Sequence, residues 1–135
     1  MNFKIILSLL AFLFTASHTV RAEEPSTPIT KVKRIDVEQY DKLRADTNVV
    51  VLDVRSPAEF QTGHIPGATN IDINSSKFSD KIAALDTNKT YLVNCAVGMR
   101  SAKAAKKMES MGFNKLYDLE TGFDGWKKAR KPVEK

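Results

Sequence analysis

The stretch Y-L-V-N-C-A-V-G-M-R-S, residues 91–101, decides the fold. Its first three residues, 91–93, form a continuous apolar run that is typical of a strand buried on both faces of a parallel sheet. The run leads directly into Cys95, and Gly98 lies in a short loop before a helix that we predict to begin at Ser101. Ligands of parallel sheets bind beyond the carboxyl ends of the strands, where loops meet helix N-termini. The stretch therefore predicts an α/β fold with a site centred on Cys95.

Strands and helices alternate on both sides of this stretch. The predicted strands are a short one that closes at Ile35 and those at 49–52, 68–73, 91–93 and 116–119. The predicted helices begin near 36 and 56 and at 75–85, 101–111 and 123–129. Such alternation implies a parallel sheet that is covered by helices on both faces.

Two of these helices carry explicit start signals. Asp36 with Gln39 three residues later resembles a capping box. Ser56 and Glu59 repeat the pattern, with Pro57 at the first helical position. We therefore expect helices to begin directly after 36 and 56.

The N-terminus sets the expected compartment. Lys4 precedes the apolar run 5–14, and Val20-Arg21-Ala22 supplies small residues around a plausible cleavage point, so residues 1–22 are predicted to be a signal peptide. An uncleaved membrane anchor is the alternative, but the run is about half of the ~20 apolar residues that a spanning helix needs. We expect a periplasmic protein without membrane attachment after cleavage, or a secreted one if the host lacks an outer membrane.

The remaining 113 residues suffice for one domain with a core. We predict a flexible leader at 23–30, a domain at 31–130 and a polar tail at 131–135. Cleavage lowers the net charge from +5 to about +3. Because the basic residues are dispersed and not interleaved with aromatic residues, we expect no nucleic-acid partner.

The single cysteine, Cys95, cannot form an internal disulfide, although exported proteins favour disulfides. An unpaired thiol in that compartment is a liability unless it is buried or used. After cleavage the chain also has a single histidine, His64, so a zinc site of Cys and His ligands is excluded. The residues indicate neither a metal nor an organic cofactor.

The loop after Cys95 has the composition of an anion cradle. It consists of Ala96, Val97, Gly98, Met99 and Arg100. A glycine at positive φ lets a loop this short curl until several backbone N–H groups converge on the sulfur. These amides, the following helix N-terminus and the Arg100 guanidinium should lower the thiol pKa to roughly 3.5 to 7.5. The alternative is a buried, inert core thiol.

Several stretches outside this loop complete a recognisable pattern. They are L-D-V-R at 52–55, E-F at 59–60, G-H-I-P-G-A-T-N-I at 63–71, M-G-F at 111–113 and G-F-D-G-W at 122–126. Together with C-A-V-G-M-R-S at 95–101, they resemble the signatures of rhodanese domains, in particular the small periplasmic single-domain rhodaneses. The similarity spans about residues 35–126, and the two main motifs at this separation are a specific combination.

The resemblance implies a rhodanese-like five-stranded parallel sheet and a two-step sulfur transfer. Cys95 would attack the outer sulfur of thiosulfate, release sulfite and hold a persulfide, from which cyanide or a thiol would take the sulfur. Residues 96–100 would bind the small anionic donor. Apart from Arg100 the loop has no charged side chain, whereas some thiosulfate-using relatives carry further basic residues, so the preferred donor stays open. We expect a monomer.

Four further positions bear on this pattern. His64 could pair with Cys95 as in a thiol protease, but in G-H-I-P-G it resembles a structural turn of the family. Asp53 and Arg55 resemble a buried ion pair at the end of a strand. Thr121 stands where the family often has a first glycine before Gly122, a departure that bears on how this segment approaches the loop.

Two other functions compete with sulfur transfer. A related phosphatase would also use a Cys-to-Arg loop, but the resemblance implies five residues between Cys and Arg in phosphatases, against four here, 96–99. A non-enzymatic module could carry persulfide or polysulfide on Cys95, or bind a protein. We favour the enzyme because the whole cradle is present from Cys95 through Gly98 to Arg100.

Overall fold

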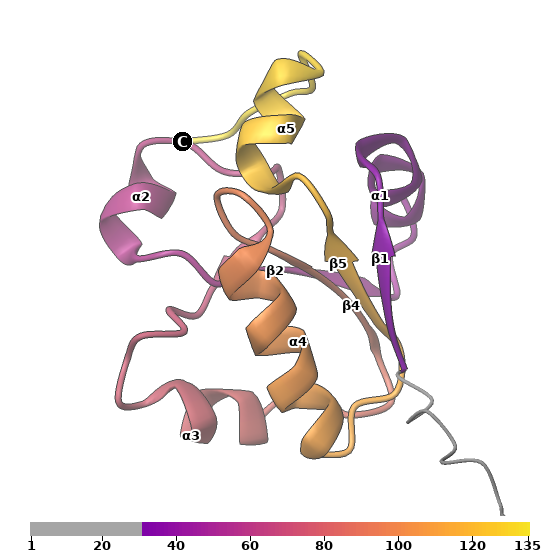
Figure 1. Cartoon of the computed structure of the whole chain (residues 1–135), viewed down its shortest axis with the longest axis vertical. Coiled ribbons are helices and arrows are strands. Elements are labelled where there is room, and N and C mark those ends of the chain that lie inside the picture. The colour runs from indigo at the N-terminus through magenta and orange to yellow at the C-terminus, as the bar shows by residue number, and fades with distance from the viewer. Residues whose placement is uncertain (1–30) are drawn as a thin grey trace, which may run out of the picture.

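The computed structural model describes residues 31–135, so the predicted signal peptide at 1–22 and leader at 23–30 lie outside the described residues. The strands are β1 (Val32–Ile35), β2 (Val49–Asp53), β3 (Thr69–Asn70), β4 (Thr90–Asn94) and β5 (Leu116–Leu119). The helices are α1 (Val37–Arg44), α2 (Pro57–Gln61), α3 (Phe78–Ala83), α4 (Met99–Ser110) and α5 (Gly122–Lys128) (Figure 1). Within residues 31–135, no helix combines the length and apolar character needed to cross a bilayer.

The five strands form one sheet in the order β1-β5-β4-β2-β3, and every neighbouring pair is parallel. The predicted α/β fold with a five-stranded parallel sheet is confirmed. Because β4 lies in the centre of the sheet, its carboxyl end is flanked by the ends of β2 and β5. The residue that follows β4 is Cys95.

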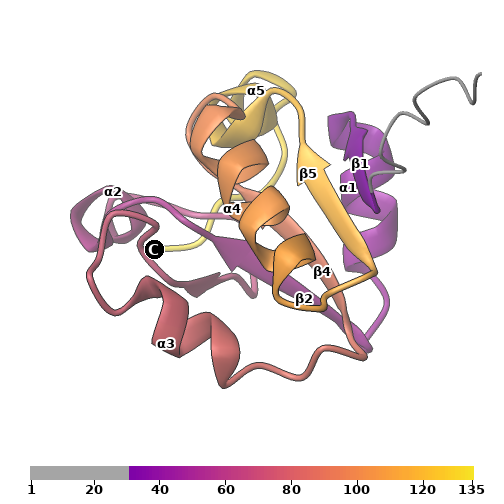
Figure 2. The ribbon, with the colours of Figure 1, turned by 60° about the horizontal axis from the view of Figure 1, so that its bottom comes forward.

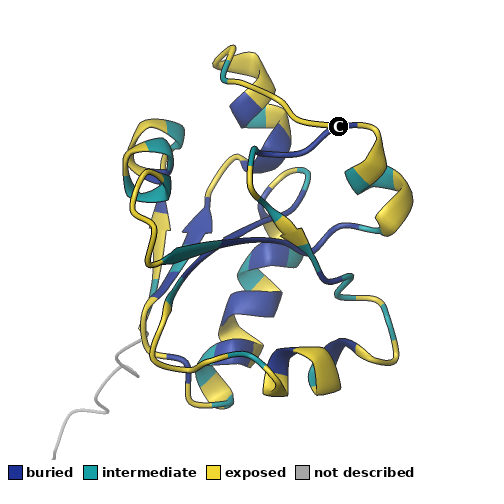
Figure 3. Cartoon of the chain, turned by 180° about the vertical axis from the view of Figure 1, so that it is seen from behind, coloured by how far each residue is buried: buried dark blue, intermediate teal, exposed yellow. Residues whose placement is uncertain are grey.

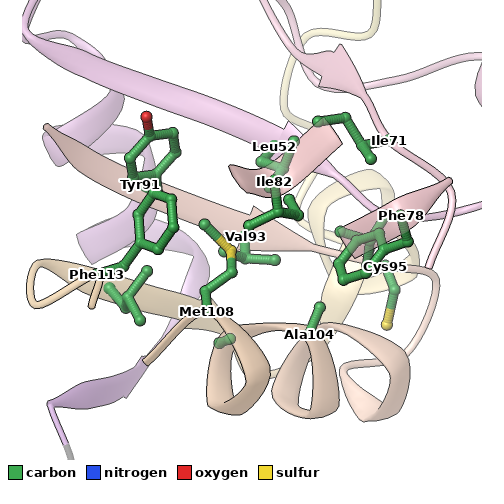
Figure 4. Packing of buried hydrophobic residues seen from close by; sticks show 13 residues of the cluster. Leu52, Ile71, Phe78, Ile82, Tyr91, Val93, Cys95, Ala104, Met108 and Phe113 are labelled. Atoms are coloured by element: carbon green, nitrogen blue, oxygen red, sulfur yellow. The ribbon is translucent and has the colours of Figure 1, made fainter. Parts of the chain in front are cut away.

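Helices cover both faces of the sheet, as predicted (Figure 2). On one face, α3 and α4 pack on a cluster that includes Leu52, Val93 and Met108. Figure 4 shows Cys95 at one end of this cluster, beside Phe78, with its sulfur directed toward α4. On the other face, α1 and α5 contribute Tyr40, Phe123 and Trp126 to a second cluster. Consecutive strand residues thus face opposite cores, which explains the continuous apolar runs.

Both predicted capping boxes are confirmed. The Asp36 side chain accepts the Gln39 amide and the Gln39 side chain accepts the Asp36 amide, which starts α1. At α2 the Ser56 hydroxyl accepts the Glu59 amide, and the Glu59 carboxylate accepts the Ser56 amide. Each box satisfies backbone donors that would otherwise lack a partner at a helix start.

Three predicted boundaries were wrong. The helix after the loop begins at Met99, two residues before the predicted Ser101, because Gly98 adopts φ +90° and turns the chain directly into the helix. The predicted strand at 68–73 is reduced to Thr69–Asn70, since β3 is an edge strand that pairs only with the end of β2. The predicted helix at 75–85 is confined to Phe78–Ala83, and turns occupy both ends.

The polar tail lies against the domain. Glu134 exchanges two backbone hydrogen bonds with His64, at 2.9 Å each. The indole N–H of Trp126 donates to the Pro132 carbonyl at 2.7 Å. The chain end therefore lies beside α2, as Figure 1 shows.

Candidate active site

Cys95 is buried directly beneath its own loop, with a side-chain exposure of 0%. The Gly98 amide donates to the Cys95 sulfur at 3.1 Å. The Ser101 hydroxyl lies 3.3 Å from the same sulfur and is itself buried in the first turns of α4. The burial map in Figure 3 shows buried residues along the central strand and in the loop that follows it. The site is thus built at the end of β4 by groups from the loop and from α4.

The loop is held from one side by β1 and β5. Arg34 Nη2 donates to the Gly98 carbonyl at 3.2 Å and to the Glu120 carbonyl at 3.3 Å. A Cβ atom on Gly98 would collide with the Glu120 carbonyl oxygen, and the positive φ of Gly98 is itself unfavourable for other residues. Gly98 is therefore required both for the turn and for the close approach of β5.

The N-terminus of α5 also holds the loop. The Phe123 amide donates to the Cys95 carbonyl at 2.7 Å and the Asp124 amide to the Ala96 carbonyl at 2.9 Å. A side chain on Gly122 would collide with Ala96. Thr121 precedes this contact at φ −98°, which any residue adopts. The departure from the family at Thr121 thus leaves the approach of α5 to the loop intact.

The pKa of the Cys95 thiol is lowered from its ordinary value. Burial raises this pKa, but hydrogen bonds from the Ser101 hydroxyl and from the backbone amides of Ser101, Val97 and Gly98 outweigh it. The positive end of the α4 dipole acts in the same direction. The geometry favours an anion on the sulfur, whether a thiolate or a persulfide.

Arg100 points at a carboxylate. Its two terminal nitrogens donate to the two Glu59 oxygens at 2.9 and 2.8 Å. Hydrogen bonding to Arg100 holds the pKa of Glu59 at about 2, in spite of burial, which raises it, and with help from Ser56. From the sequence, we expect Arg100 to face the anion at the sulfur and Glu59 to cap a helix. The structure instead shows that Arg100 joins the start of α4 to α2.

The surface around the loop combines exposed apolar side chains with basic ones. Val97 and Met99, at the tip of the loop, are 56% and 78% exposed. Beside them a cleft is lined by Ile73, Asn74, Phe78, Arg100, Lys103 and Lys107. Of the predicted substrate-binding residues, Gly98 directs its amide at the sulfur, whereas the side chains of Val97 and Met99 face solvent. That residues 96–100 bind a donor stays a prediction.

His64 and the Asp53–Arg55 pair occupy structural positions. His64 stacks on Phe60 at 3.7 Å between ring centroids, and its Nδ1 lies 2.9 Å from the Phe60 carbonyl oxygen. Arg55 and Asp53 form the predicted buried ion pair, and Arg55 Nη2 also donates to the Gly63 carbonyl at 2.8 Å. These contacts order the turn at 63–67, and they engage the His64 ring and the Gly63 carbonyl in hydrogen bonds within the domain.

Three residues around the loop were not predicted from the sequence: Arg34, Ser101 and Asp118. Ser101 looked like an ordinary residue at a helix start, and Arg34 like an exposed strand residue. Asp118 carried a signal, since it is a charged residue inside a short apolar strand. Within residues 31–135, no group of three or more His, Cys, Asp or Glu side chains is arranged to hold a metal ion.

The sequence of this chain is similar to that of a known family. Residues 36–129 match the rhodanese-like domain family. A protein of Stutzerimonas stutzeri named thiosulfate sulfurtransferase GlpE is 36% identical over 99 residues, which cover 73% of this chain and 88% of that protein.

Solved structures show the same fold. A rhodanese-related protein from Thermoplasma volcanium superimposes with a TM-score of 0.65 at 34% identity, covering 76% of this chain and 97% of the other. A protein from Rhodopseudomonas palustris, described as a protein of unknown function and possible tyrosine phosphatase, gives a TM-score of 0.62 at 30% identity. The match covers 76% of this chain and 85% of that one.

Proposed function

Because the chain belongs to the rhodanese-like domain family and is an enzyme of the thiosulfate sulfurtransferase type, we propose that it transfers a sulfane sulfur through a persulfide on Cys95. The donor is a small anion such as thiosulfate, and the acceptor is a thiol or cyanide. The observation that carries the proposal is the sulfur of Cys95 at the end of β4, with the Gly98 amide at 3.1 Å.

In the first step, the Cys95 thiolate attacks the outer sulfur of thiosulfate. A bond forms between the two sulfur atoms, the sulfur–sulfur bond of thiosulfate breaks, and sulfite leaves with the electron pair. The product is a persulfide anion at the cradle. Amides that stabilise the thiolate can also donate to this anion, so the site favours the intermediate that it forms.

In the second step, the acceptor attacks the outer sulfur of the persulfide. The bond to Cys95 breaks, and Cys95 leaves as a thiolate that the same hydrogen bonds stabilise. A lowered thiol pKa serves both steps, because the thiolate is the nucleophile in the first and the leaving group in the second. No general base is needed, in keeping with the structural role of His64.

The test is intact-mass spectrometry of the protein after thiosulfate, followed by cyanide with thiocyanate measured over many equivalents. We expect a gain of one sulfur atom on Cys95, its removal by cyanide, and repeated turnover. Cys95→Ser should form neither the adduct nor thiocyanate while keeping the wild-type circular dichroism. Ser110→Ala, an exchange of an exposed residue at the C-terminal end of α4, is the control and should keep full turnover.

The competing functions give different results in the same assay. A carrier takes up one sulfur atom on Cys95 and releases it without repeated turnover. A protein-binding module forms no adduct with thiosulfate, mercaptopyruvate or polysulfide. Hydrolysis of an aryl phosphate that is lost in Cys95→Ser indicates a phosphatase instead. Each of these outcomes contradicts sulfurtransferase activity.

We also propose that the chain is exported, cleaved after residue 22 and active in the periplasm. The support is the sequence of residues 1–22, with Lys4, the apolar run and the small residues before Glu23. Cell fractionation and N-terminal sequencing of the natural protein test it. A mature chain that begins at Glu23 in the periplasmic fraction supports export, and a cytosolic chain that begins at Met1 contradicts it.

A further inference from the structure

Asp118 lies beneath the active-site loop on the same face of the sheet as Cys95. In the register of the sheet, Asp118 of β5 pairs with Val93 of β4 on one side and with Arg34 of β1 on the other. Val93 and Cys95 are two residues apart, so both project toward α4. Ser101, in the first turns of α4, covers this face. Three segments thus bring Cys95, Ser101 and Asp118 together.

The Asp118 side chain is fully buried, yet neither carboxylate oxygen has a hydrogen bond of good geometry in the described part of the chain. Two groups lie against it. Arg34 Nε is 3.1 Å from Oδ2 and supplies a partly exposed positive charge. From α4, the Ser101 hydroxyl lowers the pKa of the carboxylate. A buried carboxylate that is incompletely paired at this place is costly and calls for a function.

Ser101 has one hydroxyl proton and two acceptors for it. When the hydroxyl donates to Asp118, its oxygen lone pairs can only accept the thiol proton of Cys95, which stabilises the neutral thiol. When the hydroxyl donates to the sulfur, it stabilises the thiolate or the persulfide, and Asp118 loses its partner. The two anions therefore compete for a single donor.

We propose that Asp118 is a positioning residue for Cys95, which acts through the direction of the Ser101 hydroxyl and couples ionisation of the thiol to a proton on the carboxylate. The thiol proton moves to the Ser101 oxygen as the hydroxyl proton of Ser101 moves to Asp118. The thiol and the carboxylate become a thiolate and a carboxylic acid, with no change in total charge. The inference rests on the proposed function only in taking the Cys95 anion as the reactive species.

The charged groups around Asp118 are compatible with such sharing. Burial raises the pKa of Asp118 and the nearby Glu120 carboxylate adds to it, whereas Ser101 and Arg34 lower it, and the balance is a raised pKa. On the other face of the sheet, the charge on Asp118 is among the causes that raise the pKa of the buried Tyr40 phenol of α1, after burial and Asp53. Arg34 is thus the cation that neutralises Asp118 when the carboxylate is charged.

The proposal predicts that Asp118→Asn lowers the pKa of the Cys95 thiol. The exchange removes a buried negative charge, and the new amide can donate to the Ser101 oxygen, which commits the hydroxyl proton to the sulfur. We expect a decrease of about one pH unit, at the low end of the shifts that neighbouring charges cause. The readout is the rate of alkylation by iodoacetamide as a function of pH, which requires no sulfur donor and therefore stands even if sulfur transfer fails.

Two further variants separate a Ser101-mediated effect from a general charge effect. Ser101→Ala should raise the thiol pKa, since it removes a donor to the thiolate, and Ser101→Thr should restore it. In the Ser101→Ala background, Asp118→Asn should lower the thiol pKa by less than it does in the wild type, because the route through the hydroxyl is gone and only the direct effect of the charge remains. Asp80→Asn, which removes an exposed carboxylate from α3, is the matched control and should leave the thiol pKa unchanged.

The wild-type chain offers a test that does not depend on the folding of a variant. In a carbon-13 NMR titration, the Asp118 carboxyl resonance should move in two steps, the second at the pH where the thiol ionises, as expected for a coupled pair. If the Asp118 resonance moves in a single step and does not change at the pH where the thiol ionises, the proposal is overturned. An unchanged or raised thiol pKa in folded Asp118→Asn, or equal effects of that exchange with and without Ser101, overturns it as well.

Discussion

Gly98 carries two constraints at once, and each excludes a side chain. Its φ of +90° belongs to the left-handed region, and its Cα lies so close to β5 that an added Cβ would collide with the Glu120 carbonyl oxygen. The same residue supplies the amide that donates to the Cys95 sulfur. Conformation, packing and chemistry of the cradle therefore depend on one position.

We predict that Gly98→Ala destabilises the protein by at least about 2 kcal/mol, from backbone strain and the clash with β5. Because the amide moves away from the sulfur, turnover should fall about 100-fold. Urea unfolding and thiocyanate formation measure the two effects. Gly112→Ala is the control: Gly112 has φ +98°, but an added Cβ there meets nothing within 4 Å, so a cost of about 1 kcal/mol and normal turnover are expected. Equal losses at both glycines would contradict the role of the β5 contact.

Two helices meet through Glu59, which completes the capping box of α2 and also binds Arg100 at the start of α4. A cation near a helix N-terminus is unfavourable unless an anion lies nearby, and Glu59 is that anion. The pair fixes the first turn of α4, from which the Ser101 hydroxyl reaches the sulfur. The position of the cradle thus depends on an ion pair between elements that are distant in sequence.

This pair gives a pH dependence of defined sign. The pKa of Glu59 is lowered from 4.5 to about 2, so the stabilisation is complete above about pH 5 and is lost as the pH falls toward 2. Since Glu59 is 38% exposed and solvent screens the pair, we expect about 1 kcal/mol. Glu59→Gln, which retains the cap, should flatten the pH dependence of the free energy of unfolding between pH 5 and 2.

The control for this experiment is Glu38→Gln, which removes a carboxylate from α1 that is 76% exposed and pairs with Lys131. It should leave the pH dependence of the free energy of unfolding unchanged, because exposed ion pairs contribute little to stability. Wild-type and Glu59→Gln curves that run parallel from pH 5 to 2 would show that the Arg100 pair contributes no stability.

At the scale of the whole molecule, the chain end completes the second core. The Trp126 indole N–H is satisfied by the Pro132 carbonyl, and the His64 amide by the Glu134 carbonyl. Deletion of residues 132–135 leaves these donors without their partners. A buried donor without a partner costs about 1 to 3 kcal/mol, so we predict a loss of about 2 kcal/mol in urea unfolding.

Deletion of Lys135 alone keeps both acceptors and should leave the unfolding midpoint unchanged. If the chain without residues 132–135 and the full chain unfold at the same urea concentration, water accepts the hydrogen bonds of Trp126 and His64 in place of the tail. Because the tail contacts the turn at 64–67 and not the loop at 95–100, the deletion should lower stability more than turnover.

The whole surface also bears on assembly. Among residues 31–135 the large exposed apolar side chains are Val97, Met99 and Val133. Two of them, Val97 and Met99, lie at the tip of the active-site loop, where a dimer contact would cover the access to Cys95. We therefore keep the prediction of a monomer, and light scattering of the mature chain should give the mass of one copy.

The sequence by itself determined the order of strands and helices, the parallel sheet, both capping boxes and the place of Cys95 before a glycine-containing loop. These features follow from local patterns: continuous apolar runs, a cap residue with its partner three positions later, and a glycine where the chain must turn. The resemblance to the family suggested the Asp53–Arg55 pair, and the structure shows it.

Only the tertiary structure decided which side chains hold the loop and the start of α4 around the sulfur. Arg34, Glu59, Ser101 and Asp118 come from β1, α2, α4 and β5, and their distances depend on the register of three strands and on how α4 packs across them. Arg100 shows the difference most clearly. Its sequence position suggested an anion at Cys95, but its direction was set by a carboxylate 41 residues away, because the fold places the starts of α2 and α4 side by side.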